Sequence, residues 1–423
     1  MAAMRDVVIT GMGVVSPIGI GTEAFWKSLE SGMSGVSPIT LFDTSALPVR
    51  FGGEIRGFDP KQHVRPRKSL KVMSRDIQFG FAAADQALTD AGVAQGTVDP
   101  ERFGVLYGAD LIYDEIHDVE GVFRRCRHEG QFDFDRWADA AMAEMYPLWL
   151  LKQLPNMIAS HVAIFHDARG PNNTLVSGEV SSLLALGEAA SVIRRGWADV
   201  MLVGGTGCRL HPGAMLLRGD DLLSHRSANP AAACRPFDRD RDGMVNGEGS
   251  AAFVLESADH ARRRSARVRS RLVSVAARTE RRHRPGEPLT GAAATAAIRG
   301  ALSAAGLGPA DIGHVNANGL ATVIEDRIEA EVIRETLADA PVTAPKSFFG
   351  HVGAGSGALE LAASLVGLER GLVPPTLNYH GADPTCPINV IHGQPAAADG
   401  GAVLKLSIAR TGQAVAAVVL PPE

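Results

Sequence analysis

Apolar residues in this chain follow two alternating patterns, short continuous runs and helical spacing, which together are typical of an α/β protein. The continuous runs predict buried strands at 6–10, 105–108, 198–205, 403–408 and 414–420. Apolar positions three or four residues apart predict amphipathic helices over 69–92 and 289–306. The order strand–helix–strand–helix–strand occurs twice along the chain. The pattern therefore predicts an internally duplicated α/β fold.

The first predicted strand leads into Gly11-Met12-Gly13, which resembles the start of a dinucleotide-binding loop. The third glycine of such a loop is missing, and Pro17 would interrupt the helix that holds the pyrophosphate. We therefore interpret the segment as a glycine turn that closes onto the core.

Residues 110–150 lack a regular pattern and mix charged with aromatic side chains. We predict a helical cap or interface segment here, with solvated surface as the simpler alternative.

The amino-acid composition excludes several classes of function. The chain has 423 residues, 45% apolar content and a net charge of −5, which does not suggest general affinity for nucleic acid. Its four cysteines are scattered without a CxxC pair, so neither a disulfide framework nor a zinc site is expected, and the usage fits a reducing cytoplasm. No apolar run is long enough to span a membrane, and the N-terminus lacks a signal-peptide core.

The segment from Asp238 to Gly249 imitates the first half of a calcium loop. Its twelfth position is Gly249, where a bidentate glutamate is needed, so we predict a hairpin turn and no metal site.

The stretch 170–189 reads as a strand, a turn rich in small residues and a helix, with Glu179 where the helix begins. Such a junction directs a side chain and several free backbone N–H groups to one point, a common way to activate a nucleophile. A carboxylate, however, is a poor nucleophile for acyl transfer.

Ordered motifs along nearly the whole chain resemble the β-ketoacyl-acyl-carrier-protein synthases of the elongating type II group. They are VVITGMGVVSPIG near the start, LPNM at 154–157, GPN at 170–172, GEAASVIRRGWADVMLVGG at 187–205, RPFDRDRDGMVNGEGSAAFVLE at 235–256, KSFFGHVGAGSGALE at 346–360 and PPTLNYHGADP at 374–384. The resemblance implies a duplicated thiolase fold with αβαβα layers and two pseudo-symmetric halves, 1–260 and 261–423. It also implies a dimer and decarboxylative condensation of carrier-protein thioesters.

When the family's catalytic residues are matched to this sequence by position, only half of them are retained. Glu179 stands at the position of the nucleophilic cysteine, and Asn318 at that of the first histidine. Lys346 and His351 match the family's lysine and second histidine.

The family's C-terminal glycine loop, FGFGG, becomes Ala409-Arg410-Thr411-Gly412-Gln413, and Arg410 is expected to point into the space left by the lost aromatic gate. The resemblance assigns substrate binding to Thr322, Arg410 and Gly412. It implies no resident cofactor, because phosphopantetheine arrives on the acyl carrier protein.

Several functions stay open. The chain resembles a chain-length factor, a subunit without the cysteine that forms a heterodimer with an active ketosynthase. Alternatives are a malonyl-carrier-protein decarboxylase, another enzyme using Glu179, Lys346 and His351, and a non-catalytic homodimer that binds acyl chains. For Glu179 the structural interpretation is an ion pair with Lys346. The protein is expected in the cytoplasm.

Overall fold

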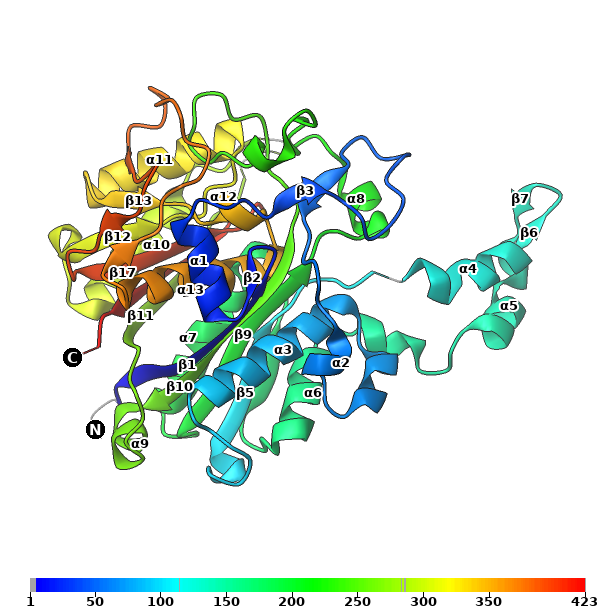
Figure 1. Cartoon of the computed structure of the whole chain (residues 1–423), viewed down its shortest axis with the longest axis horizontal. Coiled ribbons are helices and arrows are strands. Elements are labelled where there is room, and N and C mark those ends of the chain that lie inside the picture. The colour runs from blue at the N-terminus through cyan, green and yellow to red at the C-terminus, as the bar shows by residue number, and fades with distance from the viewer. Residues whose placement is uncertain (1–4, 114, 283, 285–286, 423) are drawn as a thin grey trace.

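The computed structural model describes residues 5–113, 115–282, 284 and 287–422. Among these residues, a 12-stranded sheet brings strands from both ends of the chain together (Figure 1). Neighbouring strands follow the order β15 (Asn389–Val390), β13 (Pro341–Thr343), β12 (Ile312–Asn316), β17 (Ala402–Ile408), β18 (Gln413–Leu420), β11 (Ser270–Thr279), β1 (Val7–Ser16), β10 (Glu248–Ser257), β9 (Val200–Cys208), β5 (Phe103–Gly108) and β8 (Asn172–Leu175). The twelfth strand, β2 (Gly19–Ile20), pairs with β1.

The sheet repeats one topology twice. From its middle outward, one half runs β1-β10-β9-β5-β8 and the other β11-β18-β17-β12-β13. Numbered along the chain within each half, both orders read first, fifth, fourth, second, third. The pairing types agree as well, with two antiparallel pairs followed by two parallel pairs in each half. The predicted internal duplication is confirmed.

Helices form three layers around the two halves of the sheet. The inner pair, α7 and α13, packs between the halves, where α7 contacts β5 and β9 on one side and β11 and β18 on the other. The outer pairs each cover one half, α3 and α6 the first and α10 and α11 the second. These helices are α3 (Arg75–Asp90), α6 (Met157–His166), α7 (Ser181–Arg194), α10 (Ala292–Ala305), α11 (Val323–Leu337) and α13 (Ser356–Leu368). This is the αβαβα layering that the resemblance implies.

Shorter elements complete the described chain. They are α1 (Thr22–Glu30), α2 (Pro60–His63), α8 (Pro212–Arg218), α9 (Ala258–Arg263), α12 (Lys346–Phe349), and the strand pairs β3 (Val36–Pro38) with β4 (Phe51–Gly53) and β14 (Leu372–Val373) with β16 (Ala396–Ala397).

The predicted glycine turn at the start of the chain is wrong. Strand β1 continues through Gly11 and Gly13 to Ser16. A Cβ on Gly11 would lie 2.2 Å from the Ala87 carbonyl oxygen, and one on Gly13 would lie 2.0 Å from that of Ala83. The two glycines therefore allow α3 to pack directly against the strand, which is another use of glycine than a turn.

Most of the other predicted elements are confirmed with shifted bounds. The helix expected over 69–92 begins only at Arg75, because residues 67–72 form a 3-10 helix and Met73 is extended. The helix expected over 289–306 is α10, and the strands expected at 105–108, 198–205, 403–408 and 414–420 are β5, β9, β17 and β18.

Residues 111–113 and 115–150 form an arm that extends away from the body of the molecule (Figure 1). It holds α4 (Ile116–Arg125), a hairpin of β6 (Arg127–His128) and β7 (Gln131–Phe132), and α5 (Trp137–Glu144). Its own core is a small cluster around Val122, Cys126 and Ala140. The expected helical character is confirmed, and the expected interface role remains a prediction.

Across the described ranges, no helix combines the length and the apolar character needed to cross a bilayer.

Candidate functional site

Glu179 lies in a short 3-10 turn, Gly178–Val180, between β8 and the start of α7. Gly178 has φ of 59°, in the left-handed region that favours glycine. The Ser181 hydroxyl accepts a hydrogen bond from the Ser177 N–H (2.8 Å) and donates one to the Gly178 carbonyl (2.7 Å). These bonds fix the turn and hold the Glu179 side chain at the N-terminal end of α7.

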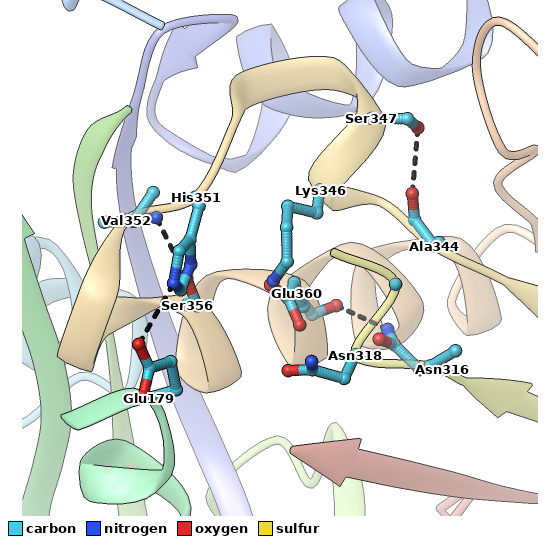
Figure 2. A network of polar contacts seen from close by, with 12 residues as sticks. Glu179, Asn316, Asn318, Ala344, Lys346, Ser347, His351, Val352, Ser356 and Glu360 are labelled. Carbon is cyan, nitrogen blue, oxygen red and sulfur yellow. Dashed lines mark hydrogen bonds and ion pairs between the residues drawn. The ribbon is translucent and has the colours of Figure 1, made fainter. Parts of the chain in front are cut away.

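The Glu179 carboxylate is held by two side chains from other parts of the chain. Arg209, just after β9, donates from Nη2 to Oε1 at 2.8 Å. His351, in the loop between α12 and α13, lies with Nε2 at 3.3 Å from the same oxygen (Figure 2). Arg209 and His351 are almost completely buried, and the Glu179 side chain is only 13% exposed.

The hydrogen bonds around His351 define its tautomer. Its Nδ1 lies 3.0 Å from the Ser356 hydroxyl oxygen, which also accepts the Val352 N–H at 2.9 Å (Figure 2). Since ionised Glu179 can only accept, Nε2 carries the imidazole proton and donates it. Burial and the Arg209 charge lower the pKa of His351, so the imidazole is neutral at neutral pH and its Nδ1 accepts from the Ser356 hydroxyl.

The electrostatics of the pair agree with this arrangement. Burial alone would raise the pKa of Glu179, but the His351 hydrogen bond and the Arg209 charge outweigh it and hold the pKa well below its ordinary range. Burial and the Arg209 charge lower the pKa of His351 to about 3. Glu179 is thus a fixed anion and His351 a fixed neutral donor at neutral pH.

The expected ion pair between Glu179 and Lys346 is wrong. The Lys346 Nζ instead donates to Glu360 on α13. Lys405 of β17 binds the second oxygen of the same carboxylate at 2.5 Å, so the three side chains form a buried Lys–Glu–Lys triad. Figure 2 shows Lys346 directed at Glu360 while Glu179 meets His351. Lys346 is the first residue of the short helix α12, and from there its side chain points toward α13.

Asn318 lies in the loop that follows β12. Buried carboxylates bind the backbone N–H groups of this loop. Glu329 accepts the backbone N–H groups of Asn318 (2.6 Å) and Gly319 (2.8 Å). Asp326 accepts that of Ala321 at 3.0 Å, and burial raises the pKa of Asp326 to about 7. The backbone of Asn318 is therefore held by buried hydrogen bonds, and its side chain is an amide that does not titrate.

A cavity opens beside Asn318. Its apolar wall consists of Leu289, Leu320, Ile324, Ile328 and Ile408, and its rim carries Arg282 and Arg410. Arg410 is half exposed and lies 3.8 Å from Glu325. Glu179, His351 and Lys346 do not line this cavity.

The three residues assigned to substrate binding differ in position. Arg410 lines both the cavity and an adjoining hollow, and Thr322 lines that hollow with a buried hydroxyl that has no partner among the described residues. Gly412 lines neither, because it turns the chain between β17 and β18 with φ of 103°. A Cβ there would lie 2.3 Å from the Glu280 carbonyl oxygen, so its glycine serves packing.

The described thiols offer no substitute nucleophile. Burial raises the pKa of Cys208 well above its ordinary value and that of Cys234 and Cys386 to about 12. Cys126 is buried in the arm. A thiol attacks a thioester only as thiolate, so Cys208, Cys234 and Cys386 stay in the unreactive thiol form at neutral pH.

Two contributors to the site escaped the sequence prediction. Arg209 is a charge directly after the buried strand β9, and Lys405 is a charge inside the mostly apolar run of β17. A cation in either setting signals a buried carboxylate partner, since an unpaired buried charge is very costly.

The arrangement lacks the parts that acyl transfer needs. A carboxylate with a strongly lowered pKa is a weak base and a weak nucleophile toward a thioester. The neutral His351 donates to this carboxylate and is not free to stabilise an oxyanion. Within the described residues, no three His, Cys, Asp or Glu side chains converge as metal ligands would.

The site predicts a specific response to acid. The lowered pKa values of Glu179 and His351 give stability that is present above their ordinary values and is lost as the pH falls. In H351Q, whose amide keeps a donor near Glu179, the fall in the urea midpoint between about pH 7 and pH 4 is expected to be smaller than in the parent. An equal fall in both proteins would contradict the neutral, buried His351.

Comparisons with known proteins identify the chain's relatives. The model of the β-ketoacyl synthase N-terminal domain matches residues 4–261, and that of the C-terminal domain matches residues 270–380. A 3-oxoacyl-[acyl-carrier-protein] synthase 2 of Synechocystis sp. is 33% identical over 395 residues, which cover 92% of both chains. The tetracenomycin polyketide synthase ketoacyl synthase alpha subunit of Streptomyces glaucescens is 36% identical over 399 residues, 92% of this chain and 91% of that one.

A solved structure extends the likeness to the fold. The ishigamide ketosynthase/chain length factor superposes with a TM-score of 0.86 at 27% identity and covers all of both chains. The thiolase-like fold implied by the sequence motifs is thus confirmed.

Proposed function

Because the chain belongs to the β-ketoacyl synthase family, we propose that it is a non-condensing subunit that pairs with an active ketosynthase in fatty-acid or polyketide synthesis. In this role it resembles a chain-length factor. The partner supplies the cysteine thiolate, and this chain supplies a structural half of the assembly.

One observation carries the proposal. Glu179, at the position of the family's nucleophile, is neutralised by Arg209 and bonded to His351. A family member that condensed by the thiolate route would need a free thiol here and a histidine where Asn318 stands. Here the charge and the hydrogen-bonding groups of the Glu179 carboxylate are instead matched by Arg209 and His351 of the same chain.

The same observation disfavours a decarboxylase. An ionised Glu179 would repel the malonyl carboxylate and the enolate that its loss creates, and His351 is already engaged. We propose that carrier-protein substrates meet this chain only through the shared assembly. The cavity beside Asn318, together with the adjoining hollow that Thr322 and Arg410 line, is the proposed contact for the end of a phosphopantetheine arm.

Co-expression tests the pairing. Cysteine-bearing ketosynthase alpha subunits, including the tetracenomycin one, are expressed one at a time with this chain carrying the only affinity tag. A one-to-one complex by size-exclusion chromatography and native mass spectrometry is expected with at least one of them. Recovery of this chain only as a homodimer from every co-expression would favour an acyl-binding protein instead.

A further inference from the structure

Three hydrogen-bond donors converge on the place that the Glu179 carboxylate fills. Arg209 Nη2 lies 2.8 Å from the carboxylate oxygen Oε1, and His351 Nε2 lies 3.3 Å from the same oxygen (Figure 2). The backbone N–H of Glu179 donates to this carboxylate as well. The two side-chain donors come from other segments, after β9 and before α13, so neither is linked locally to position 179. Together the donors form a receptor for a carboxylate, and Glu179 is the carboxylate that occupies it.

Arg209 has a donor that Glu179 does not use. The residue is only 5% exposed, and its Nε has no hydrogen-bond partner among the described residues. In a guanidinium group Nε and Nη2 lie on one edge, and such an edge can bind both oxygens of a carboxylate. Gly353 lies beside this Nε and has no side chain to block it, since a Cβ there would be 3.0 Å away. A carboxylate that is not tethered to the chain could therefore use two donors of Arg209, whereas Glu179 uses one.

The charges around Arg209 balance only while Glu179 is present. Arg209 and Arg218 lie 3.8 Å and 3.1 Å from the Asp110 carboxylate, and Glu179 is the second anion of this group. His351 adds no charge at neutral pH, because burial and the Arg209 charge lower its pKa. Without Glu179, two cations would share one anion in a largely buried place. Since an uncompensated buried charge is very costly, the receptor selects an anion.

We propose that the region around position 179 is a binding site for small carboxylates, and that the Glu179 side chain keeps it closed as a tethered ligand. The ligand class follows from the donors, because a guanidinium edge matches the planar fork of a carboxylate. In the parent protein a free carboxylate must compete with one that is attached to the site and therefore has a high effective concentration. Glu179 is thus an autoinhibitory contact. The inference goes beyond the proposed function and does not depend on it, because all the groups belong to this chain.

Truncation of Glu179 tests the site. E179A removes one methylene group and one carboxylate, which together have the size of an acetate ion. Acetate is expected to raise the urea midpoint of E179A at neutral pH relative to chloride at equal ionic strength, with a dissociation constant on the order of 1 mM. E179Q is the matched control, since its amide keeps the space filled. Its affinity for acetate, like that of the parent, is expected to be at least about tenfold lower.

Two further variants test the size of the space and the role of the cation. E179G removes one more carbon atom, so its preference is expected to move from acetate toward propionate. E179A combined with R209M lacks the guanidinium group and is expected to bind acetate at least about tenfold more weakly than E179A. If E179A is unfolded in chloride, acetate is expected to restore its cooperative unfolding transition.

A response confined to E179A and E179G, and lost with R209M, is the result that the proposal requires. If acetate and propionate act on E179A and E179G no differently from chloride, the site does not exist and the proposal is wrong. An acetate response of equal size in E179Q or in the R209M double variant also overturns it, because the ion then acts elsewhere on the surface. Failure of acetate to recover an unfolded E179A has the same consequence.

Discussion

Replacing Arg209 by methionine is expected to lower the free energy of unfolding by about 3–5 kcal/mol. The substitution leaves the Glu179 carboxylate buried without its cation, 3.3 Å from a histidine whose own ionisation is suppressed. Removing one member of a buried pair costs far more than removing both, because an uncompensated charge is left behind. Urea unfolding of the purified chain at neutral pH gives the value.

A double-mutant cycle separates the ion pair from simple packing loss. The variant with both Glu179→Leu and Arg209→Met removes the two charges together, so it is expected to be more stable than R209M alone. R218M is the matched control, since Arg218 lies 3.1 Å from Asp110 but is partly exposed, and its loss should cost no more than about 1 kcal/mol. A cost for R209M as small as that of R218M would show that Glu179 does not depend on Arg209.

Replacing Glu179 by cysteine is expected to create the only fast-reacting thiol in the protein. The new thiol would stand at the start of α7 beside Arg209, a setting that lowers a thiol pKa and favours the thiolate. Cys208, Cys234 and Cys386 have raised pKa values, so the parent should react slowly. Alkylation by iodoacetamide, followed by intact-mass spectrometry, is expected to be at least about tenfold faster in E179C than in the parent.

The same variant also tests whether catalytic groups other than the thiol are missing from the site. E179C alone should take up an acyl group but not complete condensation, because Asn318 cannot replace a histidine in stabilising the developing enolate. E179C with N318H is expected to gain further activity, and E179S serves as the control without a thiol. If E179C reacts no faster than the parent, position 179 does not hold a nucleophile's place and the positional correspondence with the family's cysteine fails.

The sequence predicted the fold well because the buried strands are almost wholly apolar and the motifs follow the family's order. It failed at β1, where two glycines imitate a turn but serve the approach of α3. Such a contact between distant segments leaves no local pattern. The arm was predicted as a helical cap or interface segment, but its separate helices and hairpin could not be placed, since its apolar residues face outward and do not follow a core-facing period.

The site was predicted in part. The motifs brought Glu179 and His351 together correctly, but they do not state which cation meets which anion. Lys346 stood in a recognisable motif and was therefore assigned to Glu179, whereas α12 directs it to Glu360. Arg209 and Lys405 belong to no recognised motif, and only the three-dimensional packing shows that they complete the two buried charge groups.

The central claim is that this chain does no condensation itself and acts through a catalytic partner. The most direct measurement follows carbon dioxide release and ketoacyl product from malonyl- and acyl-carrier proteins with this chain alone, the partner alone and the purified pair. The account predicts no carbon dioxide and no product from this chain alone. It predicts condensation by the pair, and the E179A substitution in this subunit should not abolish that condensation. Release of carbon dioxide or product by this chain alone, abolished by E179A or H351A, would contradict it.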